Sequence, residues 1–404
     1  MSKQKKLMLL GGIRYLLPVI KTAHEQGYYV ITADYLPDNI AHKYSDEYVN
    51  VSIIDKETVL RIAQEKKIDG IMSFGVDPGV TTASYVQNQM GLPSFGPYES
   101  IEILQNKDKF REFLTENGFN VPKSKGFSSV TEALKDLSWY EYPVIVKPTD
   151  SAGSKGVTRV DKEEGLQSAI EYALKHSIKG NIIVEEFIEK KGCSSDTDSF
   201  SLNGELKVVT FSAQRFDENA LNPFTPAAYS WPSTFTEAEE AYLTSEIQRL
   251  LTLLKMKTSI YNIETRIGTN GKPYIMEVSP RGGGNRLAEI VKYATGVDMI
   301  TACTRAAVGD DIEDIQTKTY NGHWAEIILH AKQKGKFKDL IVSEDMNPFI
   351  FEIDLWVEKG EWVEAFNGAN NAIGTLVMRF DSAERKEKAF SDLSWVNIRV
   401  EKNE

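Results

Sequence analysis

The first hundred residues alternate short apolar runs with segments of helical periodicity, and this order constrains the possible folds more than any other feature. The predicted elements, in chain order, are strand Lys6–Leu10, helix Ile13–Gln26, strand Tyr28–Ala33, helix Lys56–Lys66 and strand Gly70–Phe74. Strand–helix–strand order with short turns is typical of a parallel sheet with right-handed crossovers. The sequence therefore predicts an α/β domain over residues 1–105.

Small and polar residues follow the predicted strands of this domain. Ligands of parallel sheets bind at the carboxyl ends of the strands, which points to Gly11-Gly12, Asp34 and the Ser73–Asp77 turn. Two interpretations of the glycine pair stay open, a ligand-binding turn and a plain tight turn into the helix. No GxGxxG fingerprint follows the first strand, so the sequence argues against a Rossmann oxidoreductase.

Beyond this domain the pattern changes to hairpins and longer helices, which indicates a mixed α+β centre followed by a β-rich C-terminal segment. The predicted elements of the centre are a hairpin turning at Asn203-Gly204, a helix at Thr236–Lys255, and a hairpin of Ser259–Arg266 with Pro273–Val278. Segment Asn219–Ser233, which is rich in proline and aromatic residues, is predicted to be an irregular loop.

Composition excludes several classes of protein. The 404 residues include 47 Lys and Arg against 58 Asp and Glu, and this net charge of -11 argues against a nucleic-acid binder. Two cysteines, Cys193 and Cys303, are too few for a disulfide framework or a cysteine-based zinc site. The apolar run Leu7–Leu10 is too short for a secretory signal or a membrane span. We therefore expect a cytoplasmic protein without a nucleic-acid or membrane partner.

Residues suited to binding phosphate are spread along the centre in a consistent order, although no Walker P-loop occurs. The set consists of Lys107, Lys147 after the apolar strand Pro143–Val146, the small-residue loop Pro148–Val157, the segment Val184–Ile188, and Glu264, Glu277 and Arg281. Each member alone also has a structural interpretation, such as an edge lysine, a hairpin loop or an exposed strand carboxylate. Their joint occurrence favours a site that handles phosphate groups.

The predicted hairpin brings two carboxylates, Glu264 and Glu277, onto neighbouring strands. Facing carboxylates repel each other unless a cation joins them, and Mg²⁺ takes oxygen ligands from one or two carboxylates together with phosphates. Arg281, just past the second strand, is then placed to hold a phosphoryl group or an acyl phosphate.

Lys147 is expected to be exposed, so that Lys147→Ala weakens nucleotide binding and leaves thermal stability nearly unchanged.

In these elements the chain resembles the ATP-grasp superfamily, and most closely its short carbamoyl-phosphate-synthetase-like and L-amino acid ligase-like members. The likeness implies an N-terminal pre-ATP-grasp domain at 1–105, a two-part ATP-grasp centre at 106–302, and a small β-rich C-terminal domain at 303–404. It also implies a mobile lid at about 122–186. The fold class expected is thus α/β and α+β, with a parallel N-terminal sheet.

The resemblance assigns roles to individual residues. Lys107 and Lys147 would contact the phosphates of ATP, and the lid loop would contribute Ser151, Gly153, Ser154 and Gly156. The hinge Glu185, Glu186, Phe187 and Ile188 would meet the adenine edge, mainly through its backbone, and Met276 would pack under the ring. Glu264 and Glu277 would bind Mg²⁺ or Mn²⁺, and Arg281 and Glu277 would serve catalysis. The family commonly has Asn where this chain has Ser279, so a third metal ligand there stays open.

The function that the resemblance implies is an ATP-dependent ligase, which activates a small carboxylate as an acyl phosphate and joins it to an amine or another nucleophile such as a thiol. Such an enzyme could be a homodimer. Two alternatives stay open: a catalytically weak ATP-binding module, with Ser279 as the sign of lost activity, and a purine-pathway or carbamoyl-phosphate-type enzyme. Arg286 could bind a substrate carboxylate or an acidic neighbour, and Trp231 could contact substrate or cover the core.

Overall fold

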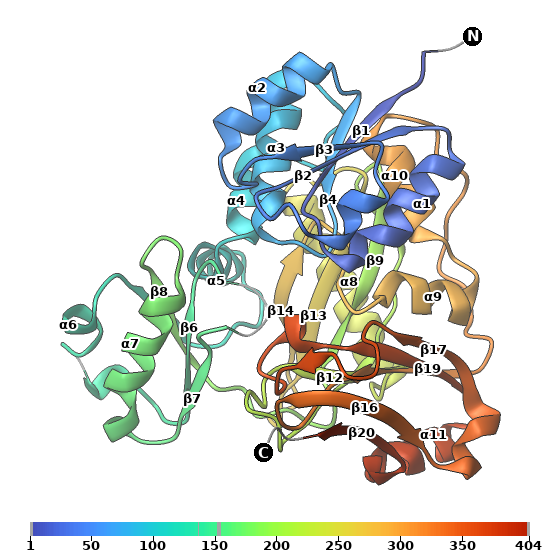
Figure 1. Cartoon of the computed structure of the whole chain (residues 1–404). Helices are drawn as coiled ribbons and strands as arrows, with labels where there is room; N and C mark the ends of the chain where they lie inside the picture. The colour runs from blue at the N-terminus through green and yellow to red at the C-terminus, as the bar shows by residue number, and fades with distance from the viewer. Residues whose placement is uncertain (1–2, 136, 152–154, 402–404) are drawn as a thin grey trace.

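The computed structural model describes residues 3–135, 137–151 and 155–401, and its N-terminal part is a parallel sheet flanked by helices (Figure 1). The sheet has the order β3-β2-β1-β4, and all of its strand pairs are parallel. Its strands and helices are β1 (Lys6–Leu10), α1 (Leu17–Glu25), β2 (Tyr29–Asp34), β3 (Glu47–Asn50), α2 (Lys56–Lys66), β4 (Gly70–Ser73), α3 (Pro78–Met90) and α4 (Tyr98–Leu104). The α/β fold expected from the alternating pattern is confirmed.

A second unit stands out from the rest of the molecule, at the left of Figure 1. It is an antiparallel sheet of order β5-β8-β6-β7 with its own apolar core, and α7 packs on β6 and β7. The elements are β5 (Ser124–Phe127), α6 (Val130–Ala133), β6 (Val144–Pro148), β7 (Thr158–Val160), α7 (Leu166–His176) and β8 (Ile182–Glu186). This unit occupies the segment expected to form the lid.

The centre of the molecule is a second antiparallel sheet, of order β10-β9-β13-β14. Its strands are β9 (Ser195–Leu202), β10 (Glu205–Val208), β13 (Ser259–Ile267) and β14 (Pro273–Ser279). The helices around it are α5 (Lys107–Glu116), α8 (Glu237–Leu253), α9 (Leu287–Thr295) and α10 (Met299–Ala307). The capping box at the start of α8 is present, since Thr236 accepts from the Glu239 backbone and Glu239 accepts from that of Thr236.

The C-terminal part contains a five-stranded sheet of order β11-β12-β15-β19-β17 and a three-stranded sheet of order β18-β16-β20. Its elements are β11 (Ala213–Phe216), β12 (Pro226–Trp231), β15 (His323–Leu329), β16 (Gly335–Val342), β17 (Ile350–Leu355), β18 (Trp362–Val363), β19 (Gly374–Phe380), α11 (Ala383–Ser391) and β20 (Val396–Glu401). Among the described residues, no helix is both long and apolar enough to cross a bilayer.

The segment predicted to be an irregular loop, Asn219–Ser233, instead contains β12, which pairs with β15 of the C-terminal sheet. Trp231 ends this strand; its side chain is 0 % exposed, and its indole N–H donates to Thr197 Oγ1 at 3.3 Å. Of the two interpretations that the sequence leaves open for Trp231, the structure shows the core residue. The local composition could not reveal this, since the pairing partner of β12 lies about a hundred residues further along the chain.

Candidate active site

The hairpin of β13 and β14 places Glu264 directly opposite Glu277, as the sequence predicts. Residues two apart on a strand share a face, so Asn262 and Ser279, which also pair, lie on the same side of the sheet. The pairing shifts by one residue just after Glu264, where the strand bulges. Side-chain exposures of 30% for Glu264 and 39% for Glu277 leave both carboxylates open to a ligand.

Two further acids lie beside Glu264 and Glu277 and were not predicted from the sequence; we call the four side chains the carboxylate row. Asp196 and Asp198 on β9 pair with Glu264 and Asn262 of β13. The Asn262 amide donates to Asp196 at 2.7 Å and to Asp198 at 3.4 Å. Burial raises the pKa of both aspartates to about 7, and the Glu264 charge adds to the effect at Asp196. The alternation Ser195-Asp196-Thr197-Asp198-Ser199 was a signal for them, because period-two acids share one face of a strand.

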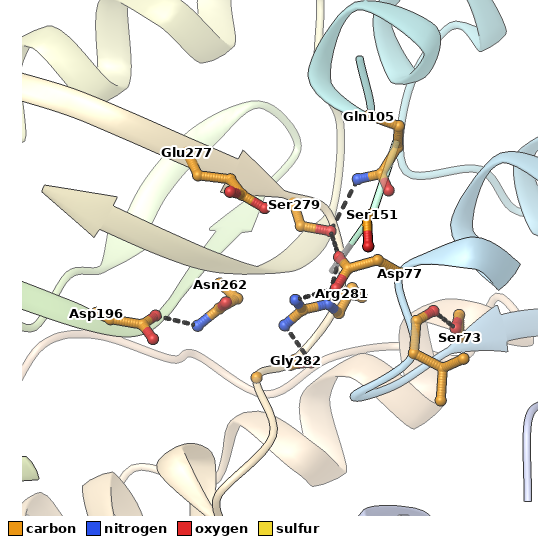
Figure 2. A network of polar contacts seen from close by, with 12 residues as sticks. Ser73, Asp77, Gln105, Ser151, Asp196, Asn262, Glu277, Ser279, Arg281 and Gly282 are labelled. Carbon is orange, nitrogen blue, oxygen red and sulfur yellow. Dashed lines mark hydrogen bonds and ion pairs between the residues drawn. The ribbon is translucent and has the colours of Figure 1, made fainter. Parts of the chain in front are cut away.

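Arg281 is held by an aspartate from the N-terminal domain (Figure 2). Its Nε and Nη2 donate to the two carboxylate oxygens of Asp77 at 2.9 and 2.7 Å. Burial alone would raise the pKa of Asp77, but the Arg281 charge outweighs it and lowers that pKa below its ordinary value. This bidentate pair fixes the orientation of Arg281 beside the carboxylate row.

Ser279 is part of the same network in Figure 2. Its hydroxyl donates to Asp77 at 2.8 Å and accepts from the Gln105 amide at 2.9 Å. Both hydrogen-bonding functions of the hydroxyl are thus engaged by the protein, and the residue serves to position Asp77.

The close approach of the two domains requires a glycine next to Arg281. A Cβ on Gly282 would lie 2.1 Å from the Phe74 ring, which no real side chain could tolerate. The Gly75 amide donates to the Gly282 carbonyl at 2.9 Å, so the loop after β4 and the loop after β14 are joined directly.

Lys107, the first residue of α5, lies beside the carboxylate row. Its ammonium is 3.4 Å from Glu277 and donates to the Ser151 carbonyl at 3.3 Å. Burial would lower the pKa of Lys107, but Glu277 and Asp77 outweigh it and raise that pKa. The lysine therefore connects the carboxylates to Ser151 of the small-residue loop.

Lys147 is less exposed than the sequence suggests. Its side chain is 14% exposed and lies 2.5 Å from Glu185, whose carboxylate also accepts from Arg111 Nε at 2.6 Å. Burial would raise the pKa of Glu185, but Arg111 and Lys147 outweigh it and lower the pKa to about 2. The expectation of an exposed Lys147 is wrong, because the ammonium lies against the buried Glu185, which Arg111 of α5 also contacts.

The hinge segment has only part of its backbone available for a ligand. The Glu186 N–H donates to the Lys123 carbonyl at 2.7 Å, and the Phe187 N–H donates to the Pro143 carbonyl at 3.1 Å. The Ile188 carbonyl accepts from Arg266 at 3.1 Å. An adenine edge would thus have to use other backbone groups of this segment. Met276 is partly exposed on β14, and its carbonyl accepts from Arg111 at 2.9 Å.

The small-residue loop is described only in part. Ser151 and Gly156 lie within the described residues, and Gly156 has a φ of 76°, the left-handed region that glycine adopts without strain. The predicted phosphate contacts Gly153 and Ser154 lie outside the described residues.

Comparison with known proteins shows that part of this candidate active site lies in a segment that matches a known family. Residues 140–289 match the family model of the ATP-grasp domain. The chain contains an ATP-grasp domain. Lys107 and Asp77 lie before the matched range, but both contact residues inside it, Glu277 and Arg281.

Similar proteins support the same fold over nearly the whole chain. The carbamoyl phosphate synthase large chain, C-terminal section, of Aquifex aeolicus is 23% identical over 350 residues, which cover 82% of this chain and 64% of that protein. The L-amino acid ligase of Bacillus licheniformis is 21% identical with a TM-score of 0.80, covering 99% of this chain and 100% of that chain. For the phosphoribosylglycinamide synthetase of Anaerococcus prevotii the identity is 20%, the TM-score 0.75, and the coverage 99% and 100%. The chain spans less than two thirds of the carbamoyl phosphate synthase relatives, and 30% of one full-length example.

The carboxylate row of the ATP-grasp domain fits a divalent cation that also has ligands from outside the protein. Within the described ranges, no three His, Cys, Asp or Glu side chains are grouped so that they could hold a metal ion by themselves. Glu264 and Glu277 supply two hard oxygen donors, and Mg²⁺ usually completes its shell with water and substrate phosphates. The residues present therefore suit a cation that arrives with a nucleotide.

Arg286 lies at the start of α9 and pairs with acidic neighbours of the protein. Its guanidinium donates to Glu289 at 3.2 and 3.3 Å and to Glu352 at 2.6 Å. Of the two interpretations that the sequence leaves open for Arg286, the structure shows the acidic neighbour. The charge of this arginine is thus already balanced inside the chain.

Proposed function

We propose that this chain is an ATP-dependent ligase that joins a small carboxylate to an amine through an acyl phosphate. The observation that carries the proposal is the ion pair of Lys107 with Glu277, close to Arg281, which Asp77 holds and whose charge acts on the neighbouring Asp196. Two fixed cations beside two open carboxylates suit the transfer of a phosphoryl group, which depends on positioning and charge neutralisation. The ATP-grasp domain and the likeness to ligases support this choice.

In this proposal Lys107 and Lys147 contact the ATP phosphates, and Met276 packs against the adenine. Glu264 and Glu277 would hold Mg²⁺ or Mn²⁺, which would neutralise phosphate charge when bound. The lid unit would close over the nucleotide and exclude water, which would otherwise hydrolyse the acyl phosphate. The cytoplasmic location and the homodimer expected from the resemblance stay predictions.

The proposed reaction has two steps. A substrate carboxylate oxygen attacks the γ-phosphorus of ATP, and ADP leaves. The amine then attacks the carbonyl carbon, inorganic phosphate leaves, and the nitrogen loses a proton. Arg281 would neutralise the charge of the acyl phosphate, and the partly exposed Asp196 would offer a carboxylate oxygen to the N–H groups of the amine.

The test is ADP release from ATP with a panel of small carboxylates and amines, repeated with hydroxylamine as the nucleophile. A ligase gives substrate-dependent ADP release and, with hydroxylamine, a hydroxamate made from the acyl phosphate. Turnover with bicarbonate and ammonia alone would support the carbamoyl-phosphate-type alternative instead.

One observation favours the second candidate, an ATP-binding module with little activity. The Ser279 hydroxyl is engaged by Asp77 and Gln105, which leaves one lone pair of its oxygen and makes it a poor third metal ligand. Tight binding of ATP without turnover across the whole panel would support this module and contradict the ligase.

A further inference from the structure

A cleft of about 570 Å³ opens between α1 and the end of β17, apart from the carboxylate row. Of the residues predicted to form the active site, only Arg286 lies among the described residues that line it. The cleft falls within the size range of small-molecule sites, about 300–1,000 Å³. It therefore has room for a ligand that the proposed reaction does not account for.

One wall of the cleft is a single face of the first helical segment. Arg14, Leu17, Pro18 and Lys21 all line it, and their spacing of three, four and seven residues puts them on one side of a helix. Leu17 and Pro18 give this wall an apolar middle. The cations Arg14 and Lys21 stand at its two ends, roughly 10 Å apart along the helix.

The opposite wall carries Trp356, just after β17. The Arg14 guanidinium lies over its indole ring at 5.3 Å, and the Tyr15 ring meets it edge-on at 6.0 Å. A guanidinium at cation–π distance from an aromatic ring still has N–H donors to offer to a planar anion. Within the described part of the chain, neither Arg14 nor Lys21 forms a salt bridge or donates a side-chain hydrogen bond.

Most of the other charged side chains of the cleft have hydrogen-bond or ion-pair partners. Arg286 is balanced by Glu289 and Glu352, and Asp354 accepts the indole N–H of Trp356 at 2.8 Å. His24 pairs with Asp46 at 2.9 Å. Glu25 is exposed at the last position of α1, roughly 16 Å along the helix from Arg14. Arg14 and Lys21 are thus, among the described residues that line the cleft, the cations without an acidic partner, and Arg14 is the one that lies against Trp356.

We propose that this cleft binds a small carboxylate with a flat apolar body. The carboxylate would accept from Arg14 in a bidentate pair, with Lys21 adding its charge, and the body would lie against Trp356, Leu17 and Pro18. A single negative charge suits the cleft better than a dianion, because Glu289 and Asp354 also line it. The inference rests on the cleft alone and is independent of the proposed ligase activity.

The experiment uses three probes of one shape: phenylacetate, 2-phenylethylamine and 2-phenylethanol, titrated into the full-length protein and followed by calorimetry. Phenylacetate is expected to bind at least tenfold more tightly than either of the others. Arg14→Gln and Trp356→Leu should each weaken phenylacetate binding at least tenfold, and Lys21→Gln should weaken it a few-fold. The matched control is Arg61→Gln, since Arg61 is an exposed arginine on α2 paired with Glu65, and it should change nothing.

Arg281→Gln separates this cleft from the candidate active site. Phenylacetate binding that survives Arg14→Gln, Trp356→Leu and Lys21→Gln but is lost in Arg281→Gln would overturn the proposal. Tighter binding of 2-phenylethylamine than of phenylacetate would overturn it as well. Should Arg14→Gln fail to fold, Trp356→Leu and Lys21→Gln still decide the outcome, and none of these results depends on whether the protein turns over ATP.

Discussion

At the scale of single residues, Glu277 and Ser279 share one face of β14 but have different neighbours. Glu277 is partly exposed beside Lys107, while Ser279 is buried and bonded to Asp77 and Gln105. A carboxylate can neutralise a bound cation, whereas a hydroxyl offers only a neutral oxygen. We expect the two positions to differ strongly in their importance for turnover.

Glu277→Gln is expected to lower ATP turnover by about 10²–10³, the typical loss when one preorganised electrostatic group is removed. Ser279→Ala should lose roughly tenfold or less, because Arg281 still holds Asp77. Ser279→Asn should retain activity. The measurement is ADP release against Mg²⁺ concentration, and parental turnover of Glu277→Gln at every concentration would show that the metal site is misassigned.

Lys147→Ala is expected to destabilise the protein, contrary to what the sequence alone indicates. The substitution leaves the Glu185 carboxylate, which is 1% exposed, with Arg111 as its remaining cation. Removing one partner of a buried charged group costs about 1–3 kcal/mol or more. The free energy of unfolding in urea measures the loss, with Lys109→Ala on the half-exposed surface of α5 as the control. An unchanged stability would mean that water replaces the ammonium without cost.

At the scale of elements, the packing of α9 on β15 buries a carboxyl group without a hydrogen bond. Glu326 on β15 is 0 % exposed, and neither of its oxygens has a partner within the described residues. Burial raises its pKa well above the ordinary value; Arg286 opposes this, and Glu289 and Glu352 add to it. The carboxyl group is therefore protonated in the folded protein at pH values where it is ionised in the unfolded chain.

Glu326→Gln is expected to stabilise the protein at pH 8 but not at pH 4. A raised acid pKa makes the unfolded state release a proton that the folded state keeps, so the wild type loses stability as pH rises above about 4.5. Each unit of difference between the pKa of Glu326 in the folded and in the unfolded state corresponds to about 1.4 kcal/mol. The free energy of unfolding of Glu326→Gln at pH 8 should therefore exceed that of the wild type by at least this amount. Urea unfolding at both pH values measures it, with the exposed Glu358→Gln as control. An equal effect at both values would contradict the titration and indicate a packing change.

At the scale of the whole molecule, the N-terminal domain completes the candidate active site. Asp77 reaches from the end of β4 to Arg281, and the backbones of Gly75 and Gly282 are bonded directly. The same domain is also anchored elsewhere, since Ser100 donates to the Leu254 carbonyl at 2.7 Å and Lys5 to the Val308 carbonyl at 2.8 Å. The relative position of the two parts thus determines where Arg281 lies.

Asp77→Asn is expected to lower the free energy of unfolding by about 3 kcal/mol, the typical cost of breaking a buried ion pair from one side. The side chain of Arg281 is 9% exposed and would keep an uncompensated charge. The double variant Asp77→Asn with Arg281→Gln should recover part of the loss, and the exposed Asp38→Asn should have no effect. A double variant no more stable than Asp77→Asn would show that the pair is not the origin of the loss.

The local features of this protein follow directly from its amino-acid sequence. Alternating apolar runs specified the parallel sheet, and turn glycines and period-two strands specified the hairpin that sets Glu264 opposite Glu277. These features depend on residues close together in the chain, where propensity and periodicity act directly. The phosphate-binding residues, taken together, resemble those of the ATP-grasp superfamily, and this resemblance pointed to the family.

Contacts between residues far apart in the chain could be read only from the tertiary structure. Asp77 lies about 200 residues from Arg281, and β12 pairs with a strand about a hundred residues away. Arg111 buries Lys147 and Glu185 through the packing of α5, and the cleft beside Trp356 exists because α1 and β17 meet. No local pattern encodes such contacts, because they form only when separately folded elements pack together.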